Sequence, residues 1–198
     1  MVEEWVDADF SGVDWYGEER SAGRYVRCRF LGADLTETQT RGVVFEECDF
    51  GNAKLNSSVH DESIFLNCRF ERTSFFDATL TACKVAGSEF ITAQLRPLRV
   101  EGGDWSYVSL RLADLAGVTL RDVRLVEADF TGAKLHGADL SGADLSRALF
   151  AEADITGADL RRATLDHVDT AGLDISGVKI GIAQAAALAQ HRGAVVDG

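Results

Sequence analysis

The sequence contains little of what would place it in the commoner classes of protein. It has one proline, Pro97, in 198 residues, so no proline-rich linker divides it. Nowhere do about 18 apolar residues follow one another, the length that a membrane-spanning helix needs. Basic residues number 20 against 32 acidic ones, and the formal charge of -12 argues against direct binding of nucleic acid. A protein with this charge is expected to bind basic partners.

Motifs that carry catalysis or hold cofactors are also missing. The sequence has no G-x-G-x-x-G, P-loop, G-x-S-x-G or H-E-x-x-H motif. Its four cysteines, Cys28, Cys48, Cys68 and Cys83, are separated by multiples of five instead of forming the close pairs of a zinc site. We therefore predict small buried cysteines, no enzyme, no cofactor and no metal. The acidic start, MVEEWVDADF, is unlike a secretory leader and leads us to expect a cytoplasmic location.

What the sequence does contain is a repeat with a period of five. Of the 36 positions whose numbers are multiples of five, from Trp5 to Ile180, 32 are apolar or aromatic, and the exceptions are Arg20, Thr40, His60 and Thr170. The residue two places before each of these centres is nearly always small. A period of five matches neither an α-helix nor a β-strand, and large residues alternating with small ones suit a narrow packed interior.

This pattern, written roughly A-(D/N)-L-x-x, resembles that of the pentapeptide-repeat family over residues 3 to 180. The resemblance implies an all-β fold, a right-handed quadrilateral β-helix with four repeats per coil, here about nine coils. At the usual strand spacing such a rod would be roughly 43 Å long. We expect two parts, a β-helix over residues 1 to 180 and a helix with a tail over residues 181 to 198.

Three places in the repeat depart from the pattern. Residues 18 to 23 surround Arg20 and residues 57 to 62 surround His60, and either stretch could hold a small loop, although an irregular coil corner is the favoured interpretation. The segment LRPLRV around Pro97 places Leu98 in a slot for a small residue and removes a backbone donor, which predicts a local bend. The sequence leaves open whether the bond before Pro97 is cis.

The end of the sequence reads as a helix. Residues 181 to 193, GIAQAAALAQHRG, are rich in alanine and end at a glycine. A helix here would cover the last coil, whose free edge is otherwise an aggregation hazard. It could also form a two-fold contact with a second copy. The residues predicted for such a homodimer are Ile182, Ala185, Ala186, Leu188, Ala189, Val195 and Val196.

Acidic residues gather in the slot just before each centre, which holds 16 of the 32. Any one of them is explained by a turn that suits aspartate. As an array they have a second interpretation, because residues 128 to 178 carry nine acids and four bases. We therefore single out as a partner-binding acidic face the residues Asp139, Asp144, Asp154, Asp159, Asp169 and Asp174.

Several local segments narrow the resemblance within the family. EEWVDADFSGVDW at the start, ECDF at 47 to 50, LRPL at 95 to 98, GADLSGA at 137 to 143 and the alanine-rich ending are similar to the mycobacterial MfpA type and, more distantly, to the Qnr quinolone-resistance proteins. The resemblance implies a dimeric DNA mimic that binds DNA gyrase in place of DNA, inhibits it and confers fluoroquinolone resistance. The unbroken phase of the repeat leaves no room for the projecting loops of the Qnr type, which favours inhibition over active protection.

Two other functions remain open on the sequence alone. The same rod could give self-immunity against a natural toxin that targets gyrase, or it could be a structural solenoid with a different protein partner. Direct binding of nucleic acid or of a membrane is not expected in either case.

Overall fold

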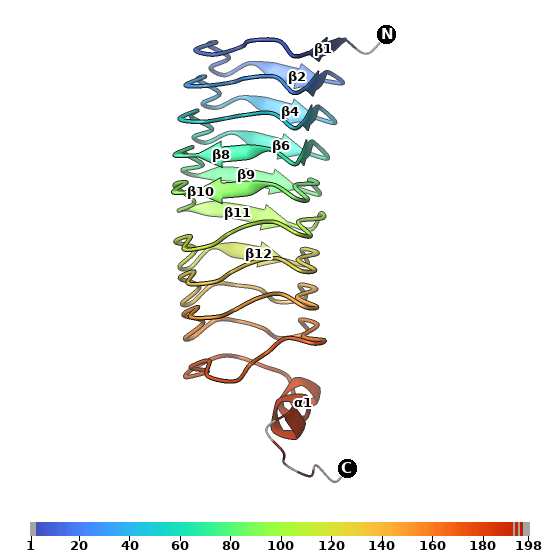
Figure 1. Ribbon diagram of the computed structural model, residues 1–198, viewed down its shortest axis with the longest axis vertical. Coiled ribbons are helices and arrows are strands. Elements are labelled where there is room, and N and C mark those ends of the chain that lie inside the picture. The colour runs from blue at the N-terminus through green and yellow to red at the C-terminus, as the bar shows by residue number, and fades with distance from the viewer. Residues whose placement is uncertain (1–2, 192, 194, 196–198) are drawn as a thin grey trace.

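A computed structural model describes residues 3 to 191, 193 and 195 of the chain. The chain winds into a straight stack of coils with its N-terminus at one end and a short helix at the other (Figure 1). All strand pairs are parallel, and each residue pairs with one 20 positions further on, such as Glu4 with Arg24. Four pentapeptides therefore complete one coil, as the repeat predicts.

Four sides follow from four pairing positions in every coil. We number them by the column of residues that each contains: side 1 runs from Glu4, side 2 from Asp9, side 3 from Asp14 and side 4 from Glu19, in steps of 20. The column of side 1 is paired without a break to Thr164, which joins nine coils. We number the coils from Glu4, so that coil 8 begins at Asp144 and coil 9 at Thr164.

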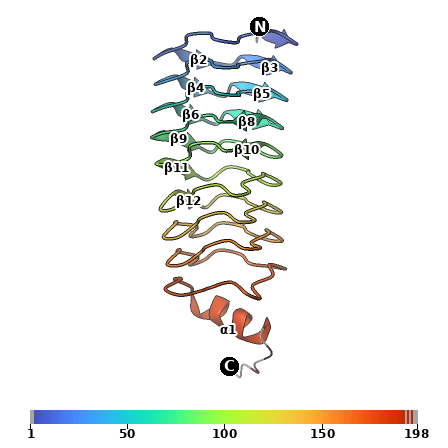
Figure 2. The same cartoon turned by 60° about the vertical axis from the view of Figure 1, so that its left-hand side comes forward.

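The strands are short because each side of a coil has only a few extended residues (Figure 2). Side 1 holds β1 (Glu4–Val6), β3 (Arg24–Val26), β5 (Val44–Glu46) and β7 (Ile64–Leu66). Side 2 holds β8 (Arg69–Glu71) and β10 (Glu89–Ile91). Side 4 holds β2 (Glu19–Ser21), β4 (Gln39–Arg41), β6 (Val59–Asp61), β9 (Ala78–Thr81), β11 (Leu98–Glu101) and β12 (Thr119–Arg121).

Tight turns at the corners connect the sides. At a typical corner the Val13 amide donates to the Phe10 carbonyl at 3.1 Å, while Gly12 has a φ of 69°. A positive φ at the third residue is the mark of a type II turn. Non-glycine residues such as Glu37, with a φ of 59°, occupy the same corner position elsewhere. The strain of about 1–2 kcal/mol at each such residue is offset by the ladder of hydrogen bonds on either side.

The repeat centres fill the interior as stacked columns. In the first coils the columns are aromatic: Tyr25, Phe45 and Phe65 stack with ring centroids 5.0 Å apart, which is close to the spacing of paired strands. After Trp105 most of the centres are leucines, which are buried as far as Leu160, whereas Leu165 is half-buried and Ile175 is 37% exposed. The four cysteines are free thiols, each at most 1% exposed, as predicted for small core residues.

Three of the polar centres lie in one column on side 4. Arg20, Thr40 and His60 follow each other in β2, β4 and β6, so neither residues 18 to 23 nor residues 57 to 62 form a loop. Thr40 Oγ1 lies 2.7 Å from His60 Nδ1, and Ser58 Oγ lies 3.0 Å from His60 Nε2. Burial lowers the pKa of His60 to about 4, so its imidazole is neutral at physiological pH.

The segment around Pro97 bends on one side only. The Arg96–Pro97 peptide bond is cis. On side 3 no pairing joins Gln94 to Asp114, although both are among the described residues. Leu98 is nevertheless buried, and it starts a strand that pairs in register with β9 and β12. The predicted irregularity is present, and the phase of the repeat survives it.

The terminal helix α1 (Ile182–His191) begins immediately after the last repeat centre. Gln184 Nε2 donates to the carbonyl of Ala163 at 2.7 Å, an acceptor that would otherwise pair with the backbone of a further coil. Gln184 Oε1 accepts the amide of Gly181 at 2.7 Å, as in a capping box. The Gln184 side chain therefore caps the N-terminus of α1 and donates to a carbonyl at the end of the backbone ladder.

A pair of adjacent glycines allows a test of the coil packing. Gly102 and Gly103 both have positive φ, but a Cβ on Gly103 would overlap the backbone carbonyl of Cys83, whereas a Cβ on Gly102 would meet nothing within 4 Å. We expect Gly102→Ala to lower the free energy of unfolding by about 1 kcal/mol and Gly103→Ala to lower it by about 3 kcal/mol. Chemical denaturation measures both, and equal losses would contradict the close packing of coils at Gly103.

Candidate functional site

The six predicted carboxylates all lie at corners and all serve the turns. In each, Oδ1 accepts the backbone amide two residues further on, at distances from 2.9 to 3.1 Å; these pairs are Asp139–Ser141, Asp144–Ser146, Asp154–Thr156, Asp159–Arg161, Asp169–Ala171 and Asp174–Ser176. The turn explanation of the aspartates is therefore correct for every one of them. It fixes the orientation of each carboxylate relative to the backbone.

The six residues do not share one face of the rod. Asp139 and Asp159 are paired neighbours on side 4, and the columns of 20 place Asp154 and Asp174 on side 3. Asp144 belongs to side 1 and Asp169 to side 2. The prediction of a single acidic face is thus replaced by a carboxylate belt around coils 7 to 9, and we use this name for the six residues together.

Arginines neutralise two members of the belt. The Arg161 guanidinium lies 2.5 Å from Asp159, whose side chain is only 10% exposed, and Arg121 lies 2.5 Å from Asp139. The sequence predicted no difference between these two and the rest. For Asp139 the sequence did contain a signal of this ion pair, because the basic residue Arg121 lies 18 positions before it.

The other four carboxylates have no lysine or arginine partner among the residues that the structure describes. Asp154 has only His136, with Nδ1 at 3.5 Å from Oδ2. Asp144, Asp169 and Asp174 contact the turn residues that follow them. These four residues are the part of the belt that is open to a partner.

Local hydrogen bonds favour the ionised form of several belt residues. Donors on Arg161 lower the pKa of Asp159 to about 2. Hydrogen bonds from Thr156 and Ser176 lower the pKa values of Asp154 and Asp174. At Asp139 burial raises the pKa, but the hydrogen bonds from Ser141 and Arg121 outweigh it and the net direction is downward. These four carboxylates are therefore charged at neutral pH.

The first coils show a different arrangement of the same residue type. Along side 2 acids and bases alternate, as Asp9, Arg29, Asp49, Arg69 and Glu89. Arg29 lies 2.6 Å from Asp9, and on side 3 Lys54 lies 3.3 Å from Asp34. Several charges one coil apart thus neutralise each other here, although Asp14 and Asp34 are both acids. Asp154 and Asp174 repel each other across one coil on side 3.

Apolar residues are exposed at the end of the rod beside the belt. Ile182 is 92% exposed and Val195 88%, Ala185 is exposed, and Ala186 and Ala189 are half-buried. Leu188 belongs to α1, but its side chain lies outside the described part of the structure, as does the whole of Val196. Several of the residues predicted for a dimer contact are therefore accessible to a second copy.

Among the described residues, 3 to 191, 193 and 195, no helix has the length and hydropathy needed to cross a bilayer. These residues also contain no group of three or more His, Cys, Asp or Glu side chains placed to hold a metal ion.

Comparison with known families finds the repeat itself. The family model described as pentapeptide repeats matches in overlapping segments, which are residues 101–132, 109–147, 128–166 and 143–179. Among curated proteins, the chain is 34% identical to the pentapeptide repeat protein MfpA of Mycobacterium tuberculosis (strain ATCC 25618 / H37Rv) over 27% of its own length. That match spans about a third of the relative, 32% of its length.

Solved structures extend the likeness to nearly the whole rod. A trypsin-treated form of QnrB1, a plasmid-mediated fluoroquinolone resistance protein, superposes with a TM-score of 0.68 at 26% identity and covers 98% of both chains. Full-length QnrB1 gives a TM-score of 0.71 at 24% identity, over 96% of this chain and 100% of that one, and shows the same fold.

The role of a belt residue in its turn can be separated from its charge. Asp144 accepts the amide of Ser146 at 3.1 Å and the hydroxyl at 2.6 Å. In Asp144→Asn a carbonyl oxygen keeps the acceptor, so we expect a change in the free energy of unfolding within about 0.5 kcal/mol, whereas Asp144→Ala should cost about 1 kcal/mol. Thermal and chemical denaturation measure both. A loss in Asp144→Asn as large as in Asp144→Ala would mean that the charge, and not the turn, stabilises this corner.

Proposed function

Since this chain belongs to the pentapeptide-repeat family, we propose that it binds DNA gyrase in place of DNA, inhibits the enzyme and thereby confers fluoroquinolone resistance. Its action in this proposal is that of a binding protein in the cytoplasm, without catalysis and without a cofactor. The observation that carries the proposal is the open part of the carboxylate belt, Asp144, Asp154, Asp169 and Asp174, beside the exposed apolar end of the rod.

Charge supports a mimic that acts through selected residues. Duplex DNA carries one negative charge per about 1.7 Å, or roughly 25 over the length expected for this rod. The chain carries a net -12, about half of that. In the first coils Asp9 and Asp34 are paired with bases one coil away, whereas Asp144, Asp154, Asp169 and Asp174 in coils 8 and 9 have no lysine or arginine partner among the described residues. A surface of gyrase that binds DNA through lysines and arginines would be attracted to this end.

The coil ladder makes most of these charges rigid. Each belt residue is held to its turn by its own Oδ1, and backbone pairing to a neighbouring coil also holds Asp139, Asp144, Asp154 and Asp159. Asp169 and Asp174 have no such bridge among the described residues. A rigid array loses little conformational entropy on binding, so more of the electrostatic attraction appears as affinity.

Self-association would double the array. The exposed residues Ile182, Ala185 and Val195 lie at the end of the rod that carries the belt. A two-fold contact through this end would place two belts on either side of the junction, in one elongated surface. The proposal therefore includes a homodimer joined through the C-terminal ends.

The relatives support the link to gyrase-directed antibiotics. QnrB1, which has the same fold over nearly the whole chain, is described as a fluoroquinolone resistance protein. The repeat register in this chain runs through nine coils without a projecting loop, which favours inhibition of the enzyme over active protection from the drug.

A supercoiling assay with purified gyrase and relaxed plasmid tests the proposal. We expect inhibition at micromolar protein. A variant with Asp144→Asn, Asp154→Asn, Asp169→Asn and Asp174→Asn should need at least about ten times more protein for half inhibition, because four charges are lost while the turn acceptors remain.

The first coils supply a matched control. Asp9, Asp14, Asp34 and Asp49 serve their turns through the same backbone hydrogen bond. Changing these four to asparagine removes the same charge and should shift half inhibition by no more than about twofold. Full supercoiling with micromolar protein present, or equal effects of the two quadruple variants, would refute the proposal. Repeating the assay with a fluoroquinolone separates inhibition from protection.

A further inference from the structure

The ladder of the rod opens between its last two coils. On sides 1 and 4 coils 8 and 9 are paired, through Asp144 with Thr164 and Asp159 with Lys179. On side 2 Asp129 pairs with Leu149, but within the described residues no bridge or backbone hydrogen bond joins Leu149 or Phe150 to Asp169. Within the described residues no bridge joins Asp154 to Asp174 on side 3 either, so coil 9 is bridged to coil 8 along sides 1 and 4 and not along sides 2 and 3.

A surface cleft of about 550 Å³ lies at this opening. One lip is the segment 148 to 153 of coil 8, and the other is formed by His167, Asp169 and residues 171 to 173 of coil 9. The lips leave backbone groups of the ladder without their usual partners across the gap, among them the amide of Phe150. In the coil above, the equivalent amide of Phe130 donates to the carbonyl of Leu149 at 2.8 Å.

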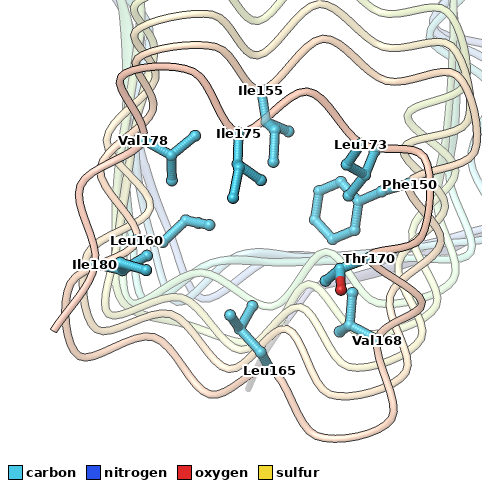
Figure 3. A pocket seen from close by; sticks show the side chains of 10 residues that line it. All are labelled: Phe150, Ile155, Leu160, Leu165, Val168, Thr170, Leu173, Ile175, Val178 and Ile180. Carbon is cyan, nitrogen blue, oxygen red and sulfur yellow. The ribbon is translucent and has the colours of Figure 1, made fainter. Parts of the chain in front are cut away.

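An apolar cavity of about 40 Å³ lies behind the cleft, inside the last two coils. Figure 3 shows side chains pointing into it from all sides, among them Phe150, Leu173, Ile175 and Thr170. Phe150 and Leu173 line both the cleft and the cavity, so the two are neighbours. A cavity of this size has room for part of an aliphatic side chain.

The rim of the cleft has a distinct chemistry. Leu149 is 54% exposed there, in the column of side 2, whose other members from Asp9 to Asp169 are all polar. Two acids, Glu152 and Asp169, line the cleft, and no lysine or arginine is among its lining residues. An occupant with an apolar centre and positive charges beside it would complement this surface.

We propose that the cleft between coils 8 and 9 is a binding site for an extended peptide segment that has one aliphatic residue flanked by lysine or arginine. Its backbone pairs with the lip at Leu149 and Phe150, as in strand addition to a sheet edge. Its aliphatic side chain lies against Phe150 and Leu173 at the entrance to the cavity, and its basic residues face Glu152 and Asp169. This site shares Asp169 with the carboxylate belt, but it takes a different kind of partner and does not depend on the proposed binding of gyrase.

Hydrogen exchange tests the opening in the ladder. In the unmodified protein we expect the amides of Phe150 and Glu152 to exchange at least about tenfold faster than those of Phe130 and Gly132 one coil above, which are paired. Equal protection of the two pairs would overturn the proposal.

Peptide binding is measured by fluorescence anisotropy with labelled seven-residue probes. The cationic probe has a central leucine between threonines and a lysine on either side; one control replaces the lysines by glutamate, and another methylates the backbone nitrogens. We expect the cationic probe to bind in the micromolar range, to slow exchange at Phe150 and Glu152, and to bind at least about tenfold more tightly than either control. No binding of the cationic probe up to about 1 mM, or equal binding of the controls, would overturn the proposal.

A disulfide across the cleft tests whether the peptide binds between its two lips. Glu152 and Gly172 are one coil apart at the corner of the cleft, and a Cβ on Gly172 would meet nothing within 4 Å. The double variant Glu152→Cys, Gly172→Cys should lose the cationic probe when oxidised and regain it on reduction, because the cross-link holds the lips together. Unchanged binding after oxidation that mass spectrometry shows to be complete would overturn the proposal. The same oxidised protein should still inhibit gyrase, so failure of one hypothesis is distinguishable from failure of the other.

Discussion

Everything in this molecule depends on parallel backbone pairing at a constant offset of 20 residues. The offset makes four pentapeptides equal to one coil and stacks every repeat centre on the one a coil before it. Phenylalanine and leucine columns fill the interior because of it, and corner residues align along the outside. An insertion of any length other than a multiple of five would move side chains from inside to outside, as a register slip does in a sheet.

The same offset determines where charge accumulates. An acid and a base one coil apart neutralise each other, as Asp9 and Arg29 do, and two acids one coil apart repel, as Asp154 and Asp174 do. The early coils contain several pairs of the first kind, although Asp14 and Asp34 are two acids one coil apart there as well. Repulsion between acids lowers stability, and the last coils retain it while they lack ladder bridges on sides 2 and 3 within the described part of the chain. The C-terminal end is thus the less self-sufficient part of the rod, which is consistent with a role in binding.

Much of the fold could be predicted from the sequence, because the period of five is written in side-chain size. The buried columns, the small cysteines and the terminal helix all follow from it. The stacking of Arg20, Thr40 and His60 could also have been predicted from their spacing of 20. The position of Gln184 at the end of the ladder could not be predicted from the repeat, because its side chain acts there in place of a backbone amide.

The candidate sites were less accessible to sequence reasoning. The sequence singled out the belt aspartates, and the offset of 18 from Arg121 was available as a signal for Asp139. It did not indicate that Arg161 pairs with Asp159, since that contact depends on the rotamer of an exposed side chain. The sequence did not indicate the cavity behind the cleft, because Leu165 and Ile175, which line that cavity, fit the repeat. Between them, the polar residue Thr170 stands at a repeat centre and faces the cavity, and it departs from the repeat.

The central claim is that open carboxylates on coils 8 and 9 bind a basic surface of gyrase. Its most direct test is the affinity of the purified chain for purified gyrase, measured by surface plasmon resonance at salt concentrations from about 0.05 to 0.5 M. The account predicts that the dissociation constant rises at least about tenfold over this range, since screening weakens attraction between exposed charges. An affinity that does not change with salt would contradict the account.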